Sequence, residues 1–191
     1  MAAPDQDSIL QLLDPAFTPT GELLRELPAE RYTDPSPCQG WTVRNVADHL
    51  INALDLFARL AEGETGIDFT APEPEHADPA GAFTEASGRC AAALRRPGTL
   101  DAELPFPGGA APGWVHAHIA ISESLIHGWD IASASGRVYR PDERVVSTTA
   151  RFQAQGDEEE RRASGMFRPA VAAPEGAGEF ERLLAFLGRR A

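Results

Sequence analysis

Residues 42–63 read TVRNVADHLINALDLFARLAEG, and this stretch decides the fold class. Its apolar side chains recur at intervals of three and four residues, at Val43, Val46, Leu50, Leu54, Phe57 and Leu60. Such spacing is typical of one buried stripe on an amphipathic helix. Thr42 is a suitable N-cap, and Gly63 follows the last apolar turn as a stop signal. We therefore predict a long helix from Thr42 to about Glu62.

Further helices are predicted on both sides of this one. Thr18-Pro19 and Asp78-Pro79 each place a capping residue before a proline, which is typical of a helix start. The expected helices cover residues 18–27, 78–96, 113–135, 141–155 and a short range around 180–187. The segment 97–112 is rich in Gly and Pro and could form a short hairpin or an ordered loop. We predict an all-α single domain, 1–191, with a four-helix bundle over about 16–136 and a short helical C-terminal extension over about 137–191.

Composition excludes several classes of function. The 191 residues carry a net charge of −12, and every one of the 17 basic residues is Arg. Lysine-based catalysis is therefore excluded, and an acidic chain without a basic cluster is not expected to bind nucleic acid. The sequence shows no uninterrupted apolar stretch of membrane-spanning length and no basic, then apolar, leader, so we expect a cytoplasmic protein without a membrane partner. The two cysteines, Cys38 and Cys90, are expected to be reduced, with Cys38 a small residue at a turn.

A candidate metal site lies in the second decisive stretch, ESLIHGWDIA, residues 123–132. Glu123 and His127 are four residues apart, so on a helix they share one face and can converge on one ion. His49, beside the apolar stripe of the 42–62 helix, is the natural third ligand. Spacing alone leaves plainer readings open. Glu123 and His127 could form a surface salt link, and His49 could be a hydrogen-bonded core residue.

The sequence motifs around these residues resemble those of a known family. Residues 37–50, PCQGWTVRNVADHL, resemble the PC-x-x-W-T-V-x-x-x-x-x-H-L segment of the DinB-like superfamily. Residues 123–132 look like the E-x-x-x-H-x-W-D-L-A motif of the actinobacterial metal-binding branch of this superfamily. That branch is related to mycothiol-dependent maleylpyruvate isomerases. Residues 165–169 and 182–188 also look like this branch, so the resemblance covers most of the chain. The chain is shorter than the two-domain isomerases and is expected to lack their full C-terminal domain.

The resemblance implies a four-helix bundle that holds a divalent metal near one end of its core. It carries His49, Glu123 and His127 over as metal ligands. Two His and one carboxylate leave positions open for water or substrate, as in catalytic sites. Zn²⁺ fits this donor set, with Ni²⁺, Fe²⁺ or Mn²⁺ as alternatives. The resemblance further implies mycothiol as a cosubstrate.

Four further residues are candidates for roles around the metal. Asp130 could orient a ligand His, or could instead bond the backbone or an Arg. Asn45 and Asn52 flank His49 by one turn each and are expected to line the pocket. His116 lies two turns before Glu123 and could be a catalytic acid or base, or could sit in solvent at the helix entrance.

Three functional hypotheses follow. The first is a metal-dependent enzyme acting on a small molecule, a transferase or isomerase that uses mycothiol. The second is a cyclase, lyase or isomerase of specialised metabolism that uses no thiol. The third is a non-catalytic metal- or ligand-binding protein. A monomer or a homodimer is expected.

Overall fold

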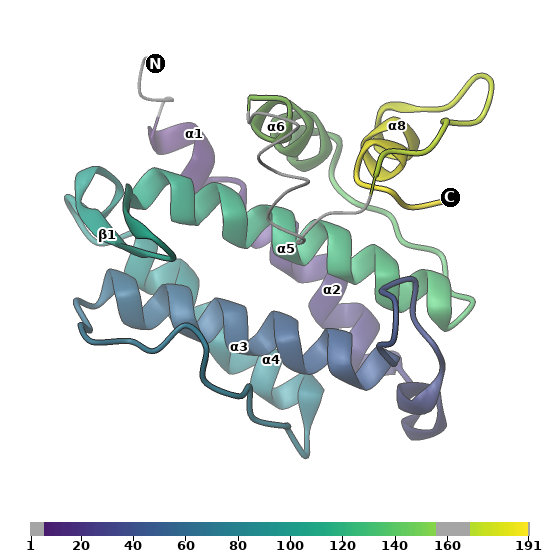
Figure 1. Cartoon of the computed structure of the whole chain (residues 1–191), viewed down its shortest axis with the longest axis horizontal. Coiled ribbons are helices and arrows are strands. Elements are labelled where there is room, and N and C mark those ends of the chain that lie inside the picture. The colour runs from purple at the N-terminus through teal and green to yellow at the C-terminus, as the bar shows by residue number, and fades with distance from the viewer. Residues whose placement is uncertain (1–5, 156–168, 191) are drawn as a thin grey trace. The chain divides into compact units, whose positions relative to one another are not determined.

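The computed structural model describes residues 6–155 and 169–190 of the chain (Figure 1). The chain divides into two compact units, Met1–Arg140 and Pro141–Ala191. The fold is mostly helical with one small two-stranded sheet. The fold class expected from the sequence is therefore confirmed in this coarser form, and the sheet occupies the segment for which a hairpin was one of two expectations.

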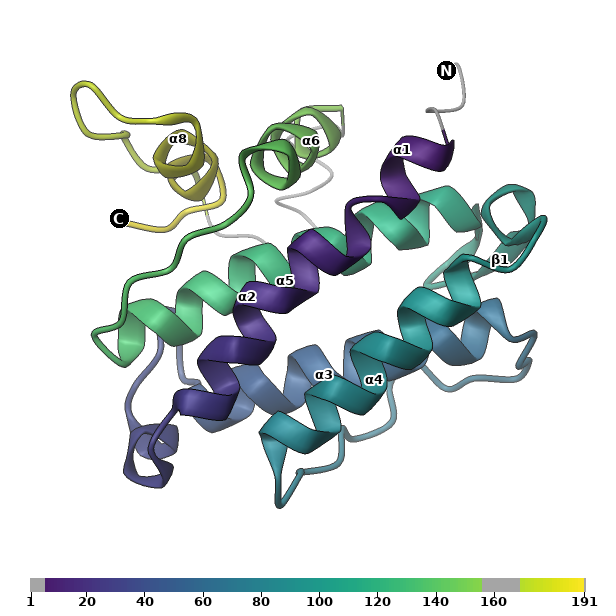
Figure 2. The ribbon, with the colours of Figure 1, turned by 180° about the vertical axis from the view of Figure 1, so that it is seen from behind.

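Four long helices build the first unit. They are α2 (Leu13–Glu26), α3 (Val43–Ala61), α4 (Pro79–Leu94) and α5 (Gly113–Ala134). Helix α3 packs on α4 and α5, and α2 packs on the same two helices, as the views from the front and from behind show (Figures 1 and 2). Their facing sides supply the core. A short helix, α1 (Gln6–Leu10), contacts α5, and a 3₁₀ turn (Ala29–Thr33) contacts α3.

The expected start of the first long helix was wrong. Helix α2 begins at Leu13 rather than at Thr18, and Pro19 lies inside it. An internal proline costs about 3 kcal/mol because it removes one backbone hydrogen bond. The earlier turns bury Leu13 and Phe17, and each such side chain contributes about 1.5–3 kcal/mol. Burial thus outweighs the local signal for a helix start at Pro19.

The helix that carries His49 forms as predicted. Thr42 caps α3, since its hydroxyl accepts from the backbone N–H of Asn45 while the Asn45 side chain accepts from the Thr42 backbone N–H. The whole predicted apolar stripe is buried. Before the cap, residues 34–41 form a tight turn closed by a bridge between Pro35 and Thr42. This turn brings Cys38 and Trp41 to the N-terminal end of α3.

A hairpin leads into the central helix α5. Strands β1 (Glu103–Phe106) and β2 (Gly109–Pro112) are antiparallel, and the turn between them places Gly108 at a φ of 85°. Gly108 suits that turn because its φ is one that other residues rarely adopt. Helix α5 then begins at Gly113 and is buried on most sides, in keeping with its contacts to α2 and α3.

Gly128 on α5 lies against the side chains of Thr20, on α2, and Tyr139. A Cβ there would meet the Tyr139 hydroxyl at 2.5 Å and would also strike Oγ1 of Thr20. These two groups are hydrogen-bonded to each other at 2.8 Å, and Thr20 donates to the carbonyl of Ser124. The glycine therefore leaves space for a polar cluster that ties α5 to α2.

Gly128→Ala is expected to lower the free energy of unfolding by about 2 kcal/mol, because the added methyl overpacks this cluster. Gly88→Ala on α4 is the matched control, since Gly88 is exposed and a Cβ there meets no atom within 4 Å. That change should stabilise by about 0.5–1 kcal/mol through helix propensity. Urea unfolding of both variants measures the contrast, and equal stabilisation by both would refute the close packing.

The second unit contains α6 (Glu143–Gln153) and α8 (Glu179–Phe186), which contact each other. Asp142 caps α6, and Ser147 donates a 2.6 Å hydrogen bond to Glu179. The backbone N–H of Val171 donates to the carbonyl of Ala185. Helices at these positions were predicted. Whether the chain is one domain, as expected from its length, stays a prediction.

Candidate metal centre

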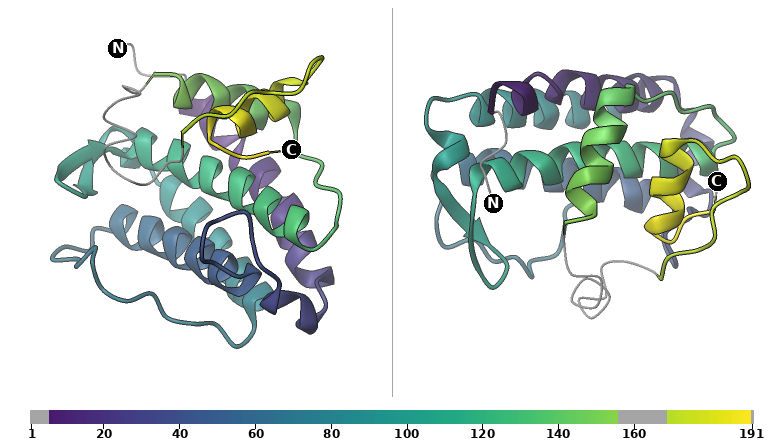
Figure 3. Two further views of the ribbon diagram at one scale, coloured as in Figure 1. Left: turned by 45° about the vertical axis from the view of Figure 1, so that its right-hand side comes forward. Right: turned by 90° about the horizontal axis from the view of Figure 1, so that it is seen from above.

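Three side chains from two helices converge at one point of the first unit. The Nε2 atom of His49 on α3 lies 3.5 Å from Oε2 of Glu123, and the Nε2 atom of His127 lies 3.1 Å from the same oxygen. One donor atom from each residue lies within 4.8 Å of the others. Helices α3 and α5 lie side by side along this stretch (Figures 1 and 3). The structure therefore brings together the three ligands expected from the sequence.

The local structure explains this convergence. Glu123 and His127 are one turn apart on α5, so both side chains leave the same face. His49 sits at the edge of the buried stripe of α3, where that helix meets α5. The side chains of His49, Glu123 and His127 are 28%, 26% and 13% exposed. The cluster is thus anchored in the core and open to solvent on one side.

The spacing of the three donor atoms fits a small divalent ion. Two ligands that each lie about 2.1 Å from a tetrahedral Zn²⁺ are about 3.4 Å apart. The distances of 3.1 Å and 3.5 Å from Glu123 to the two imidazoles bracket that value. The Oε2 atom of Glu123 is buried and accepts no hydrogen bond of ordinary geometry among the described residues. Its nearest partners are the two imidazole nitrogens at 3.1 Å and 3.5 Å, and a cation between the three groups would supply the bond that it lacks.

A carboxylate contacts the Nδ1 atom of each imidazole, on the side of the ring away from Glu123. Nδ1 of His127 lies 3.0 Å from Oδ2 of Asp130, and Nδ1 of His49 lies 2.9 Å from Oε1 of Glu73. Because a carboxylate only accepts, each Nδ1 carries the proton and donates. Each Nε2 is then free to bind a metal, as is usual for ligand histidines backed by carboxylates.

A second group, made of Cys38, His127 and Asp130, also has metal-ligand spacing. Its atoms are already paired with one another, however. Oδ2 of Asp130 accepts from Nδ1 of His127 and, at 3.4 Å, from the Cys38 thiol. The oxygen of Glu123 has no such bonds. The two groups share His127 through different nitrogens, and the hydrogen bonding favours the one built on Glu123.

The charges of the cluster follow from its contacts. Burial lowers the pKa of His49, but the contacts with Glu123 and Glu73 outweigh burial and raise it to about 9. Burial likewise opposes a charge on His127, yet Glu123 and Asp130 hold the pKa of His127 well above its usual value. The two imidazoles in turn lower the pKa of Glu123 against the effect of burial. Without a metal the cluster is an ion pair at neutral pH, and a divalent ion would replace its protons.

His116 does not join this cluster. It lies two turns before Glu123, which is about 10.5 Å along the helix axis. Its ring is fully buried, with one nitrogen 3.1 Å from the carbonyl of Pro105 and the other 3.3 Å from that of Pro112. The ring also contacts Phe57 edge-on. His116 thus joins α5 to the hairpin, and neither expectation for it, a pocket acid or base or a solvated residue, describes its position.

Asn45 and Asn52 also have other partners. Asn45 belongs to the capping box of α3. Asn52 donates to the carbonyl of Pro74 at 2.8 Å and contacts His76 at 3.0 Å. Asn45 therefore stabilises the start of α3 and Asn52 binds the segment that follows α3, and neither side chain is hydrogen-bonded to His49. Of the residues expected around the ligands, Asp130 alone contacts one of them directly.

Sequence reasoning missed three residues at this site. Glu73 lies in the segment between α3 and α4, where its distance from His49 in sequence hides the contact. Cys38 bonds to Asp130 instead of only filling a turn. The ring of Trp41 is 37% exposed and lies edge-on to His49 at 5.1 Å between ring centroids. The motif PCQGW was the available signal for Cys38 and Trp41, since it places both residues just before α3.

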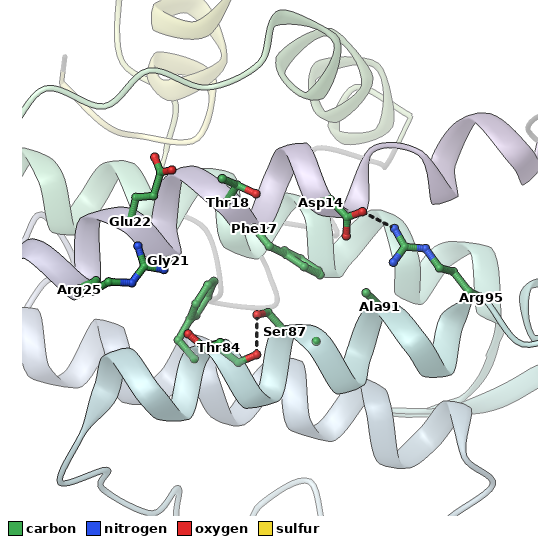
Figure 4. A pocket seen from close by; sticks show the side chains of 12 residues that line it. Asp14, Phe17, Thr18, Gly21, Glu22, Arg25, Thr84, Ser87, Ala91 and Arg95 are labelled. Carbon is green, nitrogen blue, oxygen red and sulfur yellow. Dashed lines mark hydrogen bonds and ion pairs between the residues drawn. The ribbon is translucent and has the colours of Figure 1, made fainter.

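A separate pocket of about 340 Å³ lies between α2 and α4 (Figure 4). Phe17 and Phe83 line it, and an ion pair of 2.9 Å joins Asp14 to Arg95 at its edge. No residue of the histidine–carboxylate cluster lines this pocket. It therefore adds nothing to the candidate centre.

None of the described helices combines the length and the apolar character needed to cross a membrane.

The helical fold and the two sequence motifs that carry the histidine–carboxylate cluster place the protein in the DinB-like branch related to mycothiol-dependent maleylpyruvate isomerase. The sequence model described as "Mycothiol maleylpyruvate isomerase N-terminal domain" matches residues 13–132, and the chain belongs to that family. This range contains all three candidate ligands. The family predicted from the sequence motifs is therefore confirmed.

The chain is also similar to individual proteins. Proteins from two strains of Mycobacterium tuberculosis, each named only as an uncharacterized protein, are 27% identical over 171 residues, which cover 87% of this chain and 90% of theirs. A solved structure, titled as the crystal structure of the mycothiol-dependent maleylpyruvate isomerase, matches with a TM-score of 0.57. It covers 76% of this chain and 68% of that one at 19% identity, a likeness that shows the fold.

Proposed function

We propose that this protein is a metal-dependent enzyme that acts on a small molecule and uses a low-molecular-weight thiol, mycothiol, in a transfer or isomerisation reaction. The single observation that carries the proposal is the convergence of His49, Glu123 and His127 around a buried carboxylate oxygen that has no ordinary hydrogen bond. Membership of a family named after a mycothiol-dependent isomerase supports the choice of thiol.

His49, Glu123 and His127 would hold the metal, with Zn²⁺ as the first candidate and Ni²⁺, Fe²⁺ or Mn²⁺ as alternatives. A divalent ion held there would lower the pKa of a bound thiol and so would supply a thiolate at neutral pH. Asp130 holds the imidazole of His127 through Nδ1. The partly exposed ring of Trp41 contacts His49 edge-on and would limit how a substrate approaches that side chain.

The reaction needs an electrophilic substrate. Maleylpyruvate, which appears in the name of the structural neighbour, is the first substrate to test. The second hypothesis, an enzyme that uses no thiol, would be favoured by turnover without mycothiol. The third hypothesis, a binding protein, would be favoured by tight thiol binding without turnover on any substrate. Cytoplasmic location and a monomeric or dimeric state stay predictions.

Thiol binding at the metal is the property to test. Protein loaded with Co²⁺ should develop a sulfur-to-cobalt charge-transfer band in the near ultraviolet when mycothiol is added. Cys38→Ser is the control, because Cys38 is the protein's own thiol near His127. The band should persist in this variant and disappear in His49→Ala. A band that depends on Cys38, or no band at all, would contradict a mycothiol-binding metal.

A further inference from the structure

The segment between α3 and α4 runs back along α3 (Figure 1). We call residues 73–76 of this segment the strap. Three residues of α3, spaced by four along one face, hold it. Arg44 donates to the carbonyl of His76 at 2.6 Å, Asp48 accepts from the His76 backbone N–H at 3.1 Å, and Asn52 donates to the carbonyl of Pro74 at 2.8 Å.

These bonds fix the strap beside His49. Arg44 and Asp48 lie on the N-terminal side of His49 in α3, and Asn52 lies one turn beyond it. Asp48 is buried, with 5% of its surface exposed, so this anchor point belongs to the core. A segment held at several backbone atoms keeps a defined position, unlike a loop attached only at its ends.

The strap presents Glu73 to the outer nitrogen of His49. Nδ1 of His49 lies 2.9 Å from Oε1 and 3.2 Å from Oε2 of Glu73. The opposite nitrogen, Nε2, faces Glu123. His49 is therefore held between a carboxylate on the strap and the carboxylate of the cluster.

We infer that Glu73 is a positioning residue for the metal centre, which it serves by fixing the tautomer and ring orientation of His49 from the strap. This inference rests on the proposed metal site. A proton held on Nδ1 by Glu73 keeps the Nε2 lone pair available, and the negative charge makes that lone pair a better donor. Asp130 serves His127 in the same way from within α5.

The two supports differ in exposure. Asp130 is fully buried, whereas the Glu73 side chain is 45% exposed. An exposed contact is screened by water, so its effect belongs at the lower end of the range for such partners. We expect Glu73→Gln to weaken metal binding about tenfold, the lower limit of the ~10–100-fold range.

Zn²⁺ titration of the metal-free protein against a chromophoric chelator tests the inference. Glu73→Gln should weaken binding about tenfold, whereas Glu75→Gln, an exposed neighbour on the strap, should change it less than about twofold. In a His49→Ala background, Glu73→Gln should have no further effect, because its role is exercised through that ring. An equal loss in both backgrounds would overturn the positioning role and leave only a contribution to the fold.

Nitrogen-15 NMR of the imidazole of His49 gives a readout that is independent of activity. In the metal-free protein at alkaline pH, where the ring is neutral, the signal should report protonated Nδ1, and in Glu73→Gln it should shift toward a mixture of tautomers. Wild-type affinity and an unchanged tautomer in Glu73→Gln would overturn the inference. Failure of the wild-type protein to bind any divalent metal would instead overturn the proposed function on which the inference rests.

Discussion

Replacing His127 by alanine is expected to lower the affinity for Zn²⁺ by more than about 100-fold, because a lost ligand costs more than a lost partner of a ligand. His127 is the least exposed of the three candidate ligands, at 13%, and is held by Asp130. Its removal would leave only His49 and Glu123, which come from different helices. Competition with a chromophoric chelator measures the change in affinity.

His118→Gln is the matched control for this experiment. His118 lies on the same helix, and burial lowers its pKa to about 4, so it is a neutral core residue. Its replacement should leave Zn²⁺ affinity unchanged within a factor of about three wherever circular dichroism shows a folded protein. Equal losses in the two variants would show that any damage to α5 weakens binding, and the assignment of His127 as a ligand would then fail.

The second largest effect is expected for Asp130→Asn, which should weaken Zn²⁺ binding by about 10–100-fold. Asp130 is fully buried, and its Oδ2 accepts from both His127 and Cys38. An amide in its place has no charge and can turn its own N–H toward Nδ1 of His127. That orientation would move the imidazole proton to Nε2, the atom the metal needs.

Asp101→Asn, an exposed change on the 3₁₀ turn Thr99–Asp101, is the control and should leave affinity unchanged. Asp130→Asn should also remain folded, since an amide and a carboxyl group have the same shape. A variant that folds and binds Zn²⁺ as tightly as the wild-type protein would show that Asp130 only caps a buried polar cluster.

The helices that carry the site could be read from the sequence because local signals and burial agree there. Thr42 caps α3 and the following apolar positions are all buried, so cap and periodicity indicate the same element. The spacing of Glu123 and His127 determines that they share a face once α5 is a helix. At Pro19 the two kinds of signal conflict, and the burial of neighbouring turns decides the outcome.

The surroundings of the candidate ligands could not be predicted from the sequence in this way. Glu73 reaches His49 only because the strap folds back along α3, and the anchors that fix it are bonds to backbone atoms. His116 has the helical spacing of a pocket residue, yet the hairpin folds over it, and both ring nitrogens contact carbonyl oxygens there. Such contacts depend on how irregular segments return to the helices, which residue spacing does not encode.

Anomalous diffraction from crystals of the Zn²⁺-loaded protein would locate the metal directly. We expect one peak at about 2 Å from Nε2 of His49, Oε2 of Glu123 and Nε2 of His127. We also expect Nδ1 of His127 to remain bonded to Asp130 in that crystal. A peak bound instead by Cys38 and Asp130, or no peak at the cluster, would contradict a metal site built on His49, Glu123 and His127.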